Sequence, residues 1–253
     1  MGNFISSITL QIETFYHDIY TNFIVDNRWQ WLLDGLLVTL QITFLSAIVG
    51  LILGFFVAIV RATVDKNIKS KSKKYRTVSD KFLMFIDFFC KIYLVVIRGT
   101  PVVVQLLIIY YVVFATVDVD KVFVAVTAFG LNSGAYVAEI VRSGIMSIDS
   151  GQFEAGRSLG LNYRQTMRHI VLPQAFKNVL PALANEIIVL LKETSVSGYI
   201  ALAELTYIGN MIRSITFSAM LPLLAVATVY LVVVLILTKL VNILEKRLRN
   251  SDR

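Results

Sequence analysis

The sequence contains very few of the residues from which disulfide frameworks and metal centres are built. Its 253 residues include one cysteine, Cys90, and two histidines, His17 and His169, which lie far apart in the chain. A single cysteine cannot form an internal disulfide and therefore indicates nothing about the redox compartment. Because neither histidine has a cluster of other ligands nearby, the sequence predicts no zinc site or other metal site.

The chain also lacks the motifs of an ATP-binding or catalytic domain. There is no G-x-x-x-x-G-K-[ST] sequence and no apolar strand that ends in aspartate, so the chain cannot bind the phosphates of ATP by that route. No nucleophile and base are grouped as in an enzyme active site. We therefore expect no cofactor in this chain and no covalent chemistry. The first residues, MGNFISSITLQIETF, do not have the basic region and apolar core of a cleaved signal peptide.

What the sequence does contain is long apolar runs. It is 57% hydrophobic and 16% charged, whereas a soluble domain is about half apolar and about a quarter charged. A membrane-spanning helix needs about 20 mostly apolar residues. The predicted spans are residues 31–60, 101–115, 121–145, 180–200 and 220–242. The predicted fold class is an all-α polytopic membrane helix bundle of about five transmembrane helices.

The start of the second span is open. Residues 82–97 are apolar apart from Asp87 and Lys91, and we expect them to approach the membrane along its surface before a turn at Pro101. Because proline can open a helix as well as kink one, the span begins either before or after Pro101. The mixed segment 202–219 is expected to form a short helix at the surface.

Positive charge is largely confined to one side of these spans. The net charge is +7, and the segments 61–81, 142–177 and 239–253 together hold eighteen lysines and arginines, against three in the segments on the other side. Cytoplasmic segments of membrane proteins carry an excess of these residues. The distribution predicts an extracytoplasmic N-terminus and a cytoplasmic C-terminus. It also accounts for the basic balance without a nucleic-acid partner.

Three regions follow from the spans and charges. Residues 1–30 are either an extracytoplasmic lead-in with amphipathic patches or a partly ordered tail. Residues 31–245 form the transmembrane domain with a cytoplasmic loop at 147–177, and residues 246–253 form a cytoplasmic tail. Two pairs of glycines lie four residues apart, Gly50 with Gly54 and Gly130 with Gly134. Such small-xxx-small pairs let helices approach closely. In an apolar chain with 13 glycines, chance spacing also explains them.

The most distinctive stretch is EAGRSLGLNYRQTMRHIVLP, residues 154–173. It begins polar, breaks at Gly160 and resumes as an amphipathic stretch that ends at Pro173. Apolar side chains recur at helical spacing at Leu159, Tyr163, Met167 and Ile170, with Arg157, Arg164 and Arg168 on the other side. This pattern predicts a short helix with one apolar and one basic face. The residues alone leave open whether that helix rests on lipid headgroups or contacts a partner.

Polar side chains within the spans are the second distinctive feature. Ionisable groups in a bilayer cost a few kcal/mol and are candidates for function, although they can also pair with one another and hold the bundle together. An amino-acid zwitterion needs both signs of charge, which the adjacent Lys192 and Glu193 supply, although their side chains point about 100° apart on a helix. The predicted substrate path comprises Arg98, Thr100, Gln105, Asn132, Tyr136, Glu139, Glu186, Lys192, Glu193, Thr194 and Ser195.

Residues 154–173 resemble the coupling loop of ATP-binding-cassette (ABC) importer permeases, the EAA loop. That loop reads Glu-Ala-Ala, three residues, Gly, nine residues, then Ile-x-Leu-Pro, and this chain departs from it only at Gly156, where the pattern has Ala. Glycine there should loosen the helix by up to about 1 kcal/mol. Further stretches resemble the subfamily for polar amino acids, of the histidine, glutamine, glutamate and arginine type: GLLVTLQITFLSAIVGLILG, VIRGTPVVVQL, AYVAEIVRSGI, GQFEAGRSLGL and LLKETSVSGYIALAEL.

This resemblance covers nearly the whole chain and implies a type I importer permease in a bacterial cell membrane, which moves a polar L-amino acid inward by alternating access. The implied partners are a second permease chain, identical or related, two ATPase subunits that bind ATP and Mg²⁺ in place of this chain, an extracytoplasmic amino-acid-binding protein, and the lipid bilayer. The residues implied to couple to the ATPase are Glu154, Ala155, Gly156, Leu159, Gly160, Tyr163 and Arg164.

Three alternatives remain at this point. A permease of the same superfamily for another solute would share every feature above. A self-sufficient carrier or channel is disfavoured because carriers usually have more spans and often inverted repeats. A membrane enzyme is disfavoured because no reactive cluster is present in the sequence.

Overall fold

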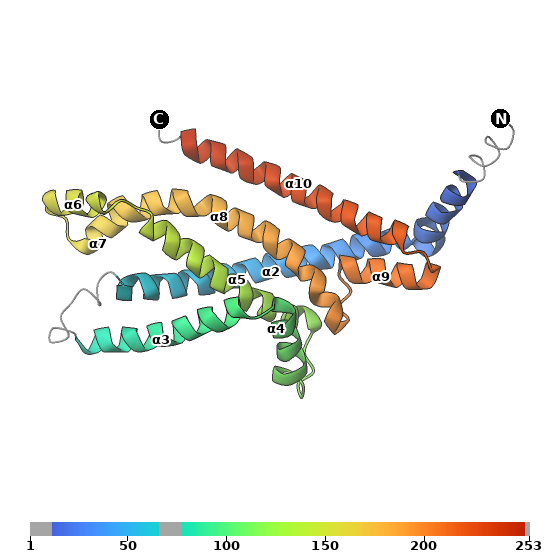
Figure 1. Ribbon diagram of the computed structural model, residues 1–253, viewed down its shortest axis with the longest axis horizontal. Helices are drawn as coiled ribbons and strands as arrows, with labels where there is room; N and C mark the ends of the chain where they lie inside the picture. Colours follow the sequence, from blue (N-terminus) through green and yellow to red (C-terminus); the bar gives the residue numbers. More distant parts are fainter. Residues whose placement is uncertain (1–11, 66–76, 251–253) are drawn as a thin grey trace.

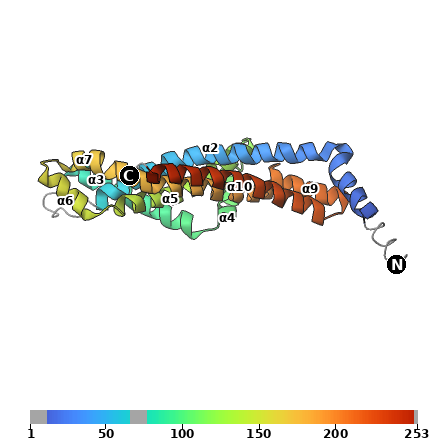
Figure 2. The same ribbon diagram turned by 90° about the horizontal axis from the view of Figure 1, so that it is seen from above.

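The computed structural model describes residues 12–65 and 77–250, and every regular element in these ranges is a helix. Most helices lie side by side in an elongated bundle (Figures 1 and 2). The α-helices are α2 (Arg28–Thr63), α3 (Val78–Gly99), α4 (Val102–Ile108), α5 (Lys121–Met146), α6 (Ser150–Ser158), α7 (Tyr163–Thr166), α8 (Leu172–Glu193), α9 (Leu205–Thr216) and α10 (Met220–Asn250). Short π or 3₁₀ segments are η1 (Tyr20–Ile24), η2 (Val25–Asn27), η5 (Ile109–Val113), η6 (Met167–Val171) and η7 (Thr194–Ile200).

Three helical segments are long and apolar enough to cross a membrane: Ile12–Thr63, Lys121–Met146 and Met220–Leu248. The pair Val78–Gly99 and Val102–Val113, bent by 110°, makes a fourth if it is one span. Helix α8 carries four charged side chains and is not among them, but it runs beside α5 from the α6–α7 end of the bundle to the α9 end (Figure 1). Each of the five predicted spans therefore overlaps one of these helices, and three or four of them overlap a segment long and apolar enough to cross a membrane.

Two predicted boundaries are wrong. Residues 82–97 do not run along the membrane surface, because they belong to α3, which packs against α2 and α5. The helix stops before Pro101 because a residue that precedes proline is forced out of the helical region, and Thr100 is extended with φ −125° and ψ 148°. The fourth helix begins at Leu172 rather than near residue 180, since Pro173 lies in its first turn, where proline is tolerated.

The small-xxx-small glycines are where α2 and α5 meet. A Cβ atom on Gly54 would overlap the side chain of Val137, and one on Gly130 would lie 2.7 Å from Val49 Cγ1. These two helices make the most extensive contact in the bundle. In a membrane such close approach is a main source of helix association, because lipid is as apolar as the side chains. The spacing of these glycines is therefore structural rather than accidental.

The lead-in is helical where the structure describes it, from Ile12 onward; residues 1–11 lie outside the described residues. It bends away from α2 at a kink where Asp26 and Asn27 have positive φ, a conformation these two residue types adopt more readily than others. The buried Arg28 holds the kink by donating to the Thr21 carbonyl at 2.6 Å and to Asp26 at 2.9 Å.

The lead-in is also tied to α9. The Thr216 hydroxyl donates to Asn22 Oδ1 at 2.8 Å, and Asn22 is fully buried. The described part of the lead-in thus forms a helix that contacts the bundle.

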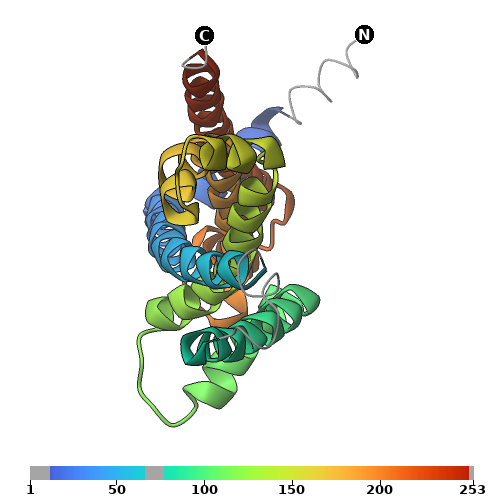
Figure 3. The same cartoon turned by 90° about the vertical axis from the view of Figure 1, so that its left-hand side faces the viewer.

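The helices bring the basic segments to one end of the bundle. This end, which faces the viewer in Figure 3, holds α6, α7, the end of α2, the start of α3 and the end of α10. The other end holds α9 and the lead-in. Most of the basic 61–81 segment, residues 66–76, lies outside the described residues. The arrangement agrees with the orientation predicted from charge, which places the α6–α7 end in the cytoplasm.

Labelling from outside the cell tests this orientation. We expect a cysteine at Ser214, exposed on α9, to react with a membrane-impermeant thiol reagent in intact cells. A cysteine at Ser158, exposed at the end of α6, should react only after the cells are opened. The native Cys90 is buried and can be replaced by alanine to remove background. Labelling of Ser158→Cys in intact cells would reverse the predicted topology.

Candidate functional site

The predicted coupling segment is built from α6 and α7 with defined starts and stops. The Asp149 side chain caps α6 by accepting from the Gly151 N–H at 2.6 Å. At the other end Gly160 has φ +76°, and the N–H groups of Leu161 and Gly160 donate to the carbonyls of Gly156 and Arg157 at 3.0 and 2.9 Å. This pair of bonds is a Schellman motif, which stops a helix at a glycine. The predicted break at Gly160 is confirmed.

A second cap begins α7 directly after the turn. Asn162 Oδ1 accepts from the Gln165 N–H, and Gln165 Oε1 accepts from the Asn162 N–H, each at 2.9 Å. This capping box fixes the entry of the chain into α7. The turn between the two helices, Gly160–Asn162, is therefore specified by its own residues: Gly160 ends α6 and Asn162 begins α7.

The prediction of one amphipathic helix that contains both Leu159 and Tyr163 is wrong. The Schellman turn separates them, so Leu159 ends α6 and Tyr163 begins α7. The stretch also does not end at Pro173, because η6 continues directly into α8. The coupling segment is thus a helix–turn–helix unit joined to a membrane-spanning helix.

Close packing of α6 on α7 explains the glycine that departs from the EAA pattern. A Cβ atom on Gly156 would lie 2.5 Å from both Cγ2 and Oγ1 of Thr166, which is fully buried. Beside this contact the rings of Phe153 and Tyr163 stack, with centroids 6.2 Å apart and planes inclined by 14°. Glycine at 156 therefore leaves room for the Thr166 side chain, although glycine lowers the helix propensity of α6.

We expect Gly156→Ala to destabilise this unit by about 1–3 kcal/mol, the usual cost of overpacking. Thr166→Ala alone should be nearly neutral, because the buried Thr166 hydroxyl makes no hydrogen bond among the described residues. The double variant should recover most of the loss, since the overlapping atoms are gone. Thermal unfolding of the purified protein measures all three, and simple additivity of the two changes would contradict the packing argument.

The exposed face of the unit carries most of the predicted coupling residues. Glu154, Ala155, Leu159 and Arg164 are exposed, and Leu159 is exposed to 75% although it is a large apolar side chain at a turn. Among the described residues Glu154 makes no hydrogen bond or ion pair. A hollow of about 730 Å³ lies beside α6, and Glu154, Arg157 and Tyr163 are among its lining residues. These features describe a surface available to another protein.

The predicted substrate-path residues fall into three groups. In the first, Gln105 is buried and donates from Nε2 to the Thr100 carbonyl and hydroxyl at 3.1 and 2.9 Å and to the Ile97 carbonyl at 2.8 Å. Asn132 on α5 donates to Gln105 Oε1 at 3.1 Å. Gln105 therefore supplies a hydrogen-bond donor to the Ile97 and Thr100 carbonyls where α3 ends, and its bond from Asn132 ties α4 to α5.

The second group is charged and lies between α3 and α5. Arg98 Nη1 lies 3.6 Å from Glu139 Oε2, and the Arg98 guanidinium lies 5.7 Å from the centre of the Tyr136 ring, within cation–π range. Glu139 also accepts two hydrogen bonds from Arg142. Arg98, Glu139 and Arg142 line one hollow of about 500 Å³ together with Arg61 and Lys91.

Sequence reasoning missed two residues that bind predicted path residues, Arg142 and Ser133. Arg142 was assigned only to the basic cytoplasmic segment, although its i,i+3 spacing from Glu139 on one helix predicts the pair. Ser133 on α5 donates to Glu186 on α8 at 3.0 Å, and both side chains are buried. Glu186 therefore joins α5 to α8.

The remaining residues lie at the end of α8. Lys192 is exposed, Glu193 is half-buried, and the two make no ion pair with each other in the described structure. Thr194 is fully buried and donates to the Leu191 carbonyl at 2.7 Å. Lys192 and Ser195 line a hollow of about 310 Å³ against α9 and α10, different from the hollow that Arg98 and Glu139 line. Of the predicted zwitterion pair, Lys192 therefore does not share a hollow with Arg98 and Glu139.

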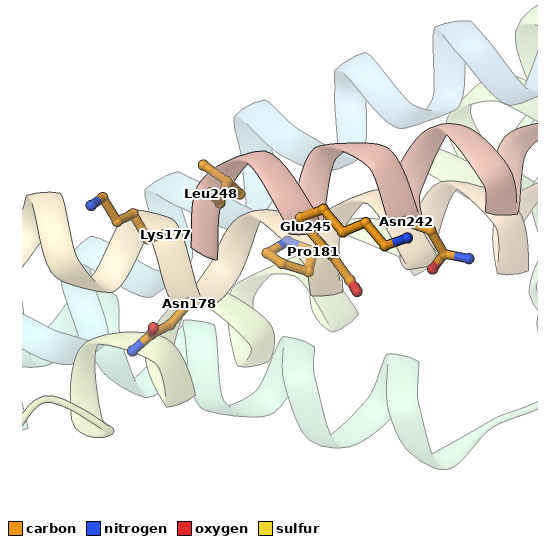
Figure 4. A pocket seen from close by; sticks show the side chains of 7 residues that line it. Lys177, Asn178, Pro181, Asn242, Glu245 and Leu248 are labelled. Atoms are coloured by element: carbon orange, nitrogen blue, oxygen red, sulfur yellow. The ribbon is translucent and has the colours of Figure 1, made fainter. Parts of the chain in front are cut away.

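A further hollow lies between α8 and α10 and contains none of the predicted site residues (Figure 4). Its volume is about 460 Å³, and its lining residues include Lys177 and Asn178 of α8 and Asn242 and Glu245 of α10. It lies at the same end of the bundle as the coupling segment.

Comparison with known proteins places these features in a family. Residues 81–250 match the family described as binding-protein-dependent transport system inner membrane component. The arginine transport system permease protein ArtQ of Bacillus subtilis is 36% identical over 224 residues, which cover 88% of this chain and 94% of ArtQ. A putative glutamine transport system permease protein GlnP of Rickettsia typhi is 34% identical over 220 residues, or 86% of this chain and 93% of GlnP.

A solved structure, described as an amino acid ABC transporter with histidines, matches with a TM-score of 0.75 and 37% identity over 89% of this chain and 98% of that one. The chain therefore belongs to the family of inner membrane components of binding-protein-dependent transport systems, and its helices form the type I ABC importer permease fold. It is a multi-pass protein of the bacterial cell membrane and a transport subunit.

Proposed function

We propose that this chain is the permease subunit of an ABC importer that moves a polar L-amino acid into the cytoplasm. The observation that carries the substrate class is the similarity, over almost the full length of both chains, to permeases named for arginine and glutamine transport. In this proposal ATP and Mg²⁺ bind to partner ATPase subunits, and this chain holds no cofactor of its own.

The coupling segment supports the ATPase partner. A large apolar side chain such as Leu159 is rarely left exposed at the tip of a water-facing turn unless another protein covers it. Glu154 lies on the same short unit and is free to pair with a cation of the partner. Because a Schellman turn and a capping box hold this unit in shape, a partner that grips it moves it as one piece, and η6 passes that movement to α8.

The charged group between α3 and α5 supports a site for a zwitterion. Arg98 offers a cation for the substrate carboxylate, and Glu139 offers an anion for the ammonium group, in one hollow and near the polar pair of Gln105 and Asn132. This location fits the substrate better than that of Lys192, which lines a different hollow against α9 and α10. The path predicted from sequence is retained in this proposal, with its charged centre at Arg98 and Glu139.

The exposure of this hollow supports a second permease chain. The side chain of Arg98 is 41% exposed on the single chain, and Tyr136 is exposed beside it. Charged side chains that face lipid are costly, and a second protein surface over this hollow would remove that cost. A second permease, identical or related, closes the path from that side, and an extracytoplasmic binding protein delivers the amino acid to its outer opening.

The test is ATP-dependent uptake of a panel of labelled amino acids by the reconstituted complex. We expect uptake of one or a few polar amino acids only when ATPase subunits and binding protein are both present. Uptake that proceeds without ATP, or a preference for a solute that is not an amino acid, would overturn the proposal.

A further inference from the structure

A groove near the cytoplasmic end of the bundle plays no part in the proposed transport path. Three helices wall it, α2 with Phe55 and Ile59, α5 with Val141 and Ile145, and α8 with Leu172 and Phe176. Its volume is about 470 Å³. The groove lies where the coupling segment joins the membrane-spanning part of α8.

The groove is built to hold something apolar from the side. Its floor is made of buried side chains, among them Val141, Ile145 and Val179, whereas the side chains at its edges, Ile59 and Phe176, are more than half exposed. A groove open at the side of a membrane bundle is accessible to lipid chains, and its apolar lining offers them packing without unpaired polar groups.

One lining residue is charged, and it lies at one end of the groove, so the two ends differ in polarity. Arg168 lies in η6, at the coupling end, four residues before Leu172 and eight before Phe176 on the same helical face. It is exposed, and the described residues provide it with no ion pair. From Arg168 toward Val179 the groove runs toward the middle of the bundle, and all its other lining residues are apolar. A cation at the cytoplasmic end and an apolar channel leading inward match the two parts of a lipid in the cytoplasmic leaflet.

We propose that this groove binds one anionic phospholipid of the cytoplasmic leaflet, with the lipid phosphate on the Arg168 guanidinium and an acyl chain along the floor. The planar guanidinium binds a phosphate through two parallel hydrogen bonds, and basic pockets between membrane helices on the cytoplasmic side bind anionic headgroups. The bound lipid contacts α2, α5 and α8 together. It therefore links α8, which continues from the coupling segment, to α2 and α5.

Native mass spectrometry of the purified complex tests the site. The probes are phosphatidylglycerol and phosphatidylcholine with identical acyl chains, and the readout is how many molecules of each the permease retains. We expect Arg168→Gln to lower the preference for phosphatidylglycerol about fivefold, as loss of one basic side chain at a membrane surface does. Lys177→Gln, which removes a unit charge on the α10 side of α8 (Figure 4), should leave the preference unchanged.

Two further variants test the apolar part of the groove. Ile59→Trp places a bulky ring at the edge and should reduce retention of both lipids, whereas Ile52→Trp, on an exposed part of α2 outside the groove, should not. A photoreactive amino acid at Phe176 should form adducts with phospholipid in membranes. Equal loss of preference in Arg168→Gln and Lys177→Gln would reduce the effect to general charge attraction and overturn the proposal. Adducts from Phe176 to another protein chain would also overturn it.

Discussion

Glu154→Gln should uncouple the importer while the permease still inserts and folds. Glu154 is exposed and makes no contact with a polar partner among the described residues, so its loss costs the isolated chain little. Removing one charge from a desolvated pair at an interface costs about 2 kcal/mol or more, which is about thirtyfold in affinity. We therefore expect weak binding of the ATPase subunits and loss of both uptake and substrate-stimulated ATP hydrolysis in the reconstituted complex.

The matched control is Glu245→Gln. Glu245 is an exposed carboxylate at the same end of the bundle, on α10, away from the coupling segment. The Glu245→Gln substitution removes the same charge and should leave substrate-stimulated ATP hydrolysis near the native rate. Gly160→Val provides a second probe, because a branched side chain is strained at φ +76° while no atom lies within 4 Å of the added Cβ. If Glu154→Gln and Gly160→Val both hydrolyse ATP normally in response to substrate, the coupling role of this segment is wrong.

Arg98→Gln should abolish most uptake without loss of assembled protein. It removes the cation proposed to bind the substrate carboxylate but leaves the Glu139–Arg142 pair intact. A charge-assisted hydrogen bond contributes about 1.5–3 kcal/mol, which corresponds to a decrease of about tenfold to a hundredfold in the uptake efficiency. Uptake kinetics and the yield of assembled complex are both to be measured.

Arg142→Gln is the comparison that separates transport from folding. Arg142 makes the hydrogen bonds to Glu139, whereas Arg98 lies 3.6 Å away, so loss of Arg142 should lower the yield of assembled complex first. If Arg98→Gln lowers yield as much as Arg142→Gln, and the protein that does assemble transports normally, then Arg98 has a structural role. The parallel test of Lys192→Met, Glu193→Gln and the double variant decides whether the end of α8 contributes to selectivity as well.

Local sequence patterns predicted the existence of the helices better than the residues at which they begin and end. The apolar runs located α5 to within one residue and α2 to within three residues at each end, because a bilayer imposes both length and composition on a span. They located the start of α10 at Met220, but this helix continues eight residues beyond the predicted end at 242. The break at Gly160 could be predicted because the glycine acts locally. The start of α8 could not be predicted from apolar character, since Lys177 and Pro181 interrupt the pattern while the backbone remains helical.

Contacts between different helices were the least predictable. Nothing near Gly156 in the sequence indicates that Thr166 occupies the space of its missing side chain. The pairing of Ser133 with Glu186 and that of Arg98 with Glu139 depend on how α5 lies against α8 and α3. The polar residues that the sequence placed in spans therefore include most of the residues that form these contacts. Their order in the sequence does not show which of them contact one another.

Because of the bend between α3 and α4, a rotation of α3 about its own axis would displace α4 sideways. The segment Val102–Val113 leaves α3 at 110° and, at 1.5 Å per residue, extends about 18 Å from the bend. A twist of α3 about its own axis by about 10° leaves α3 nearly in place but sweeps the far end of that arm sideways by about 3 Å. Gln105 is the fourth residue of this arm, about 6 Å from the bend, so the same twist would displace it sideways by about 1 Å, about a third of the displacement at Val113.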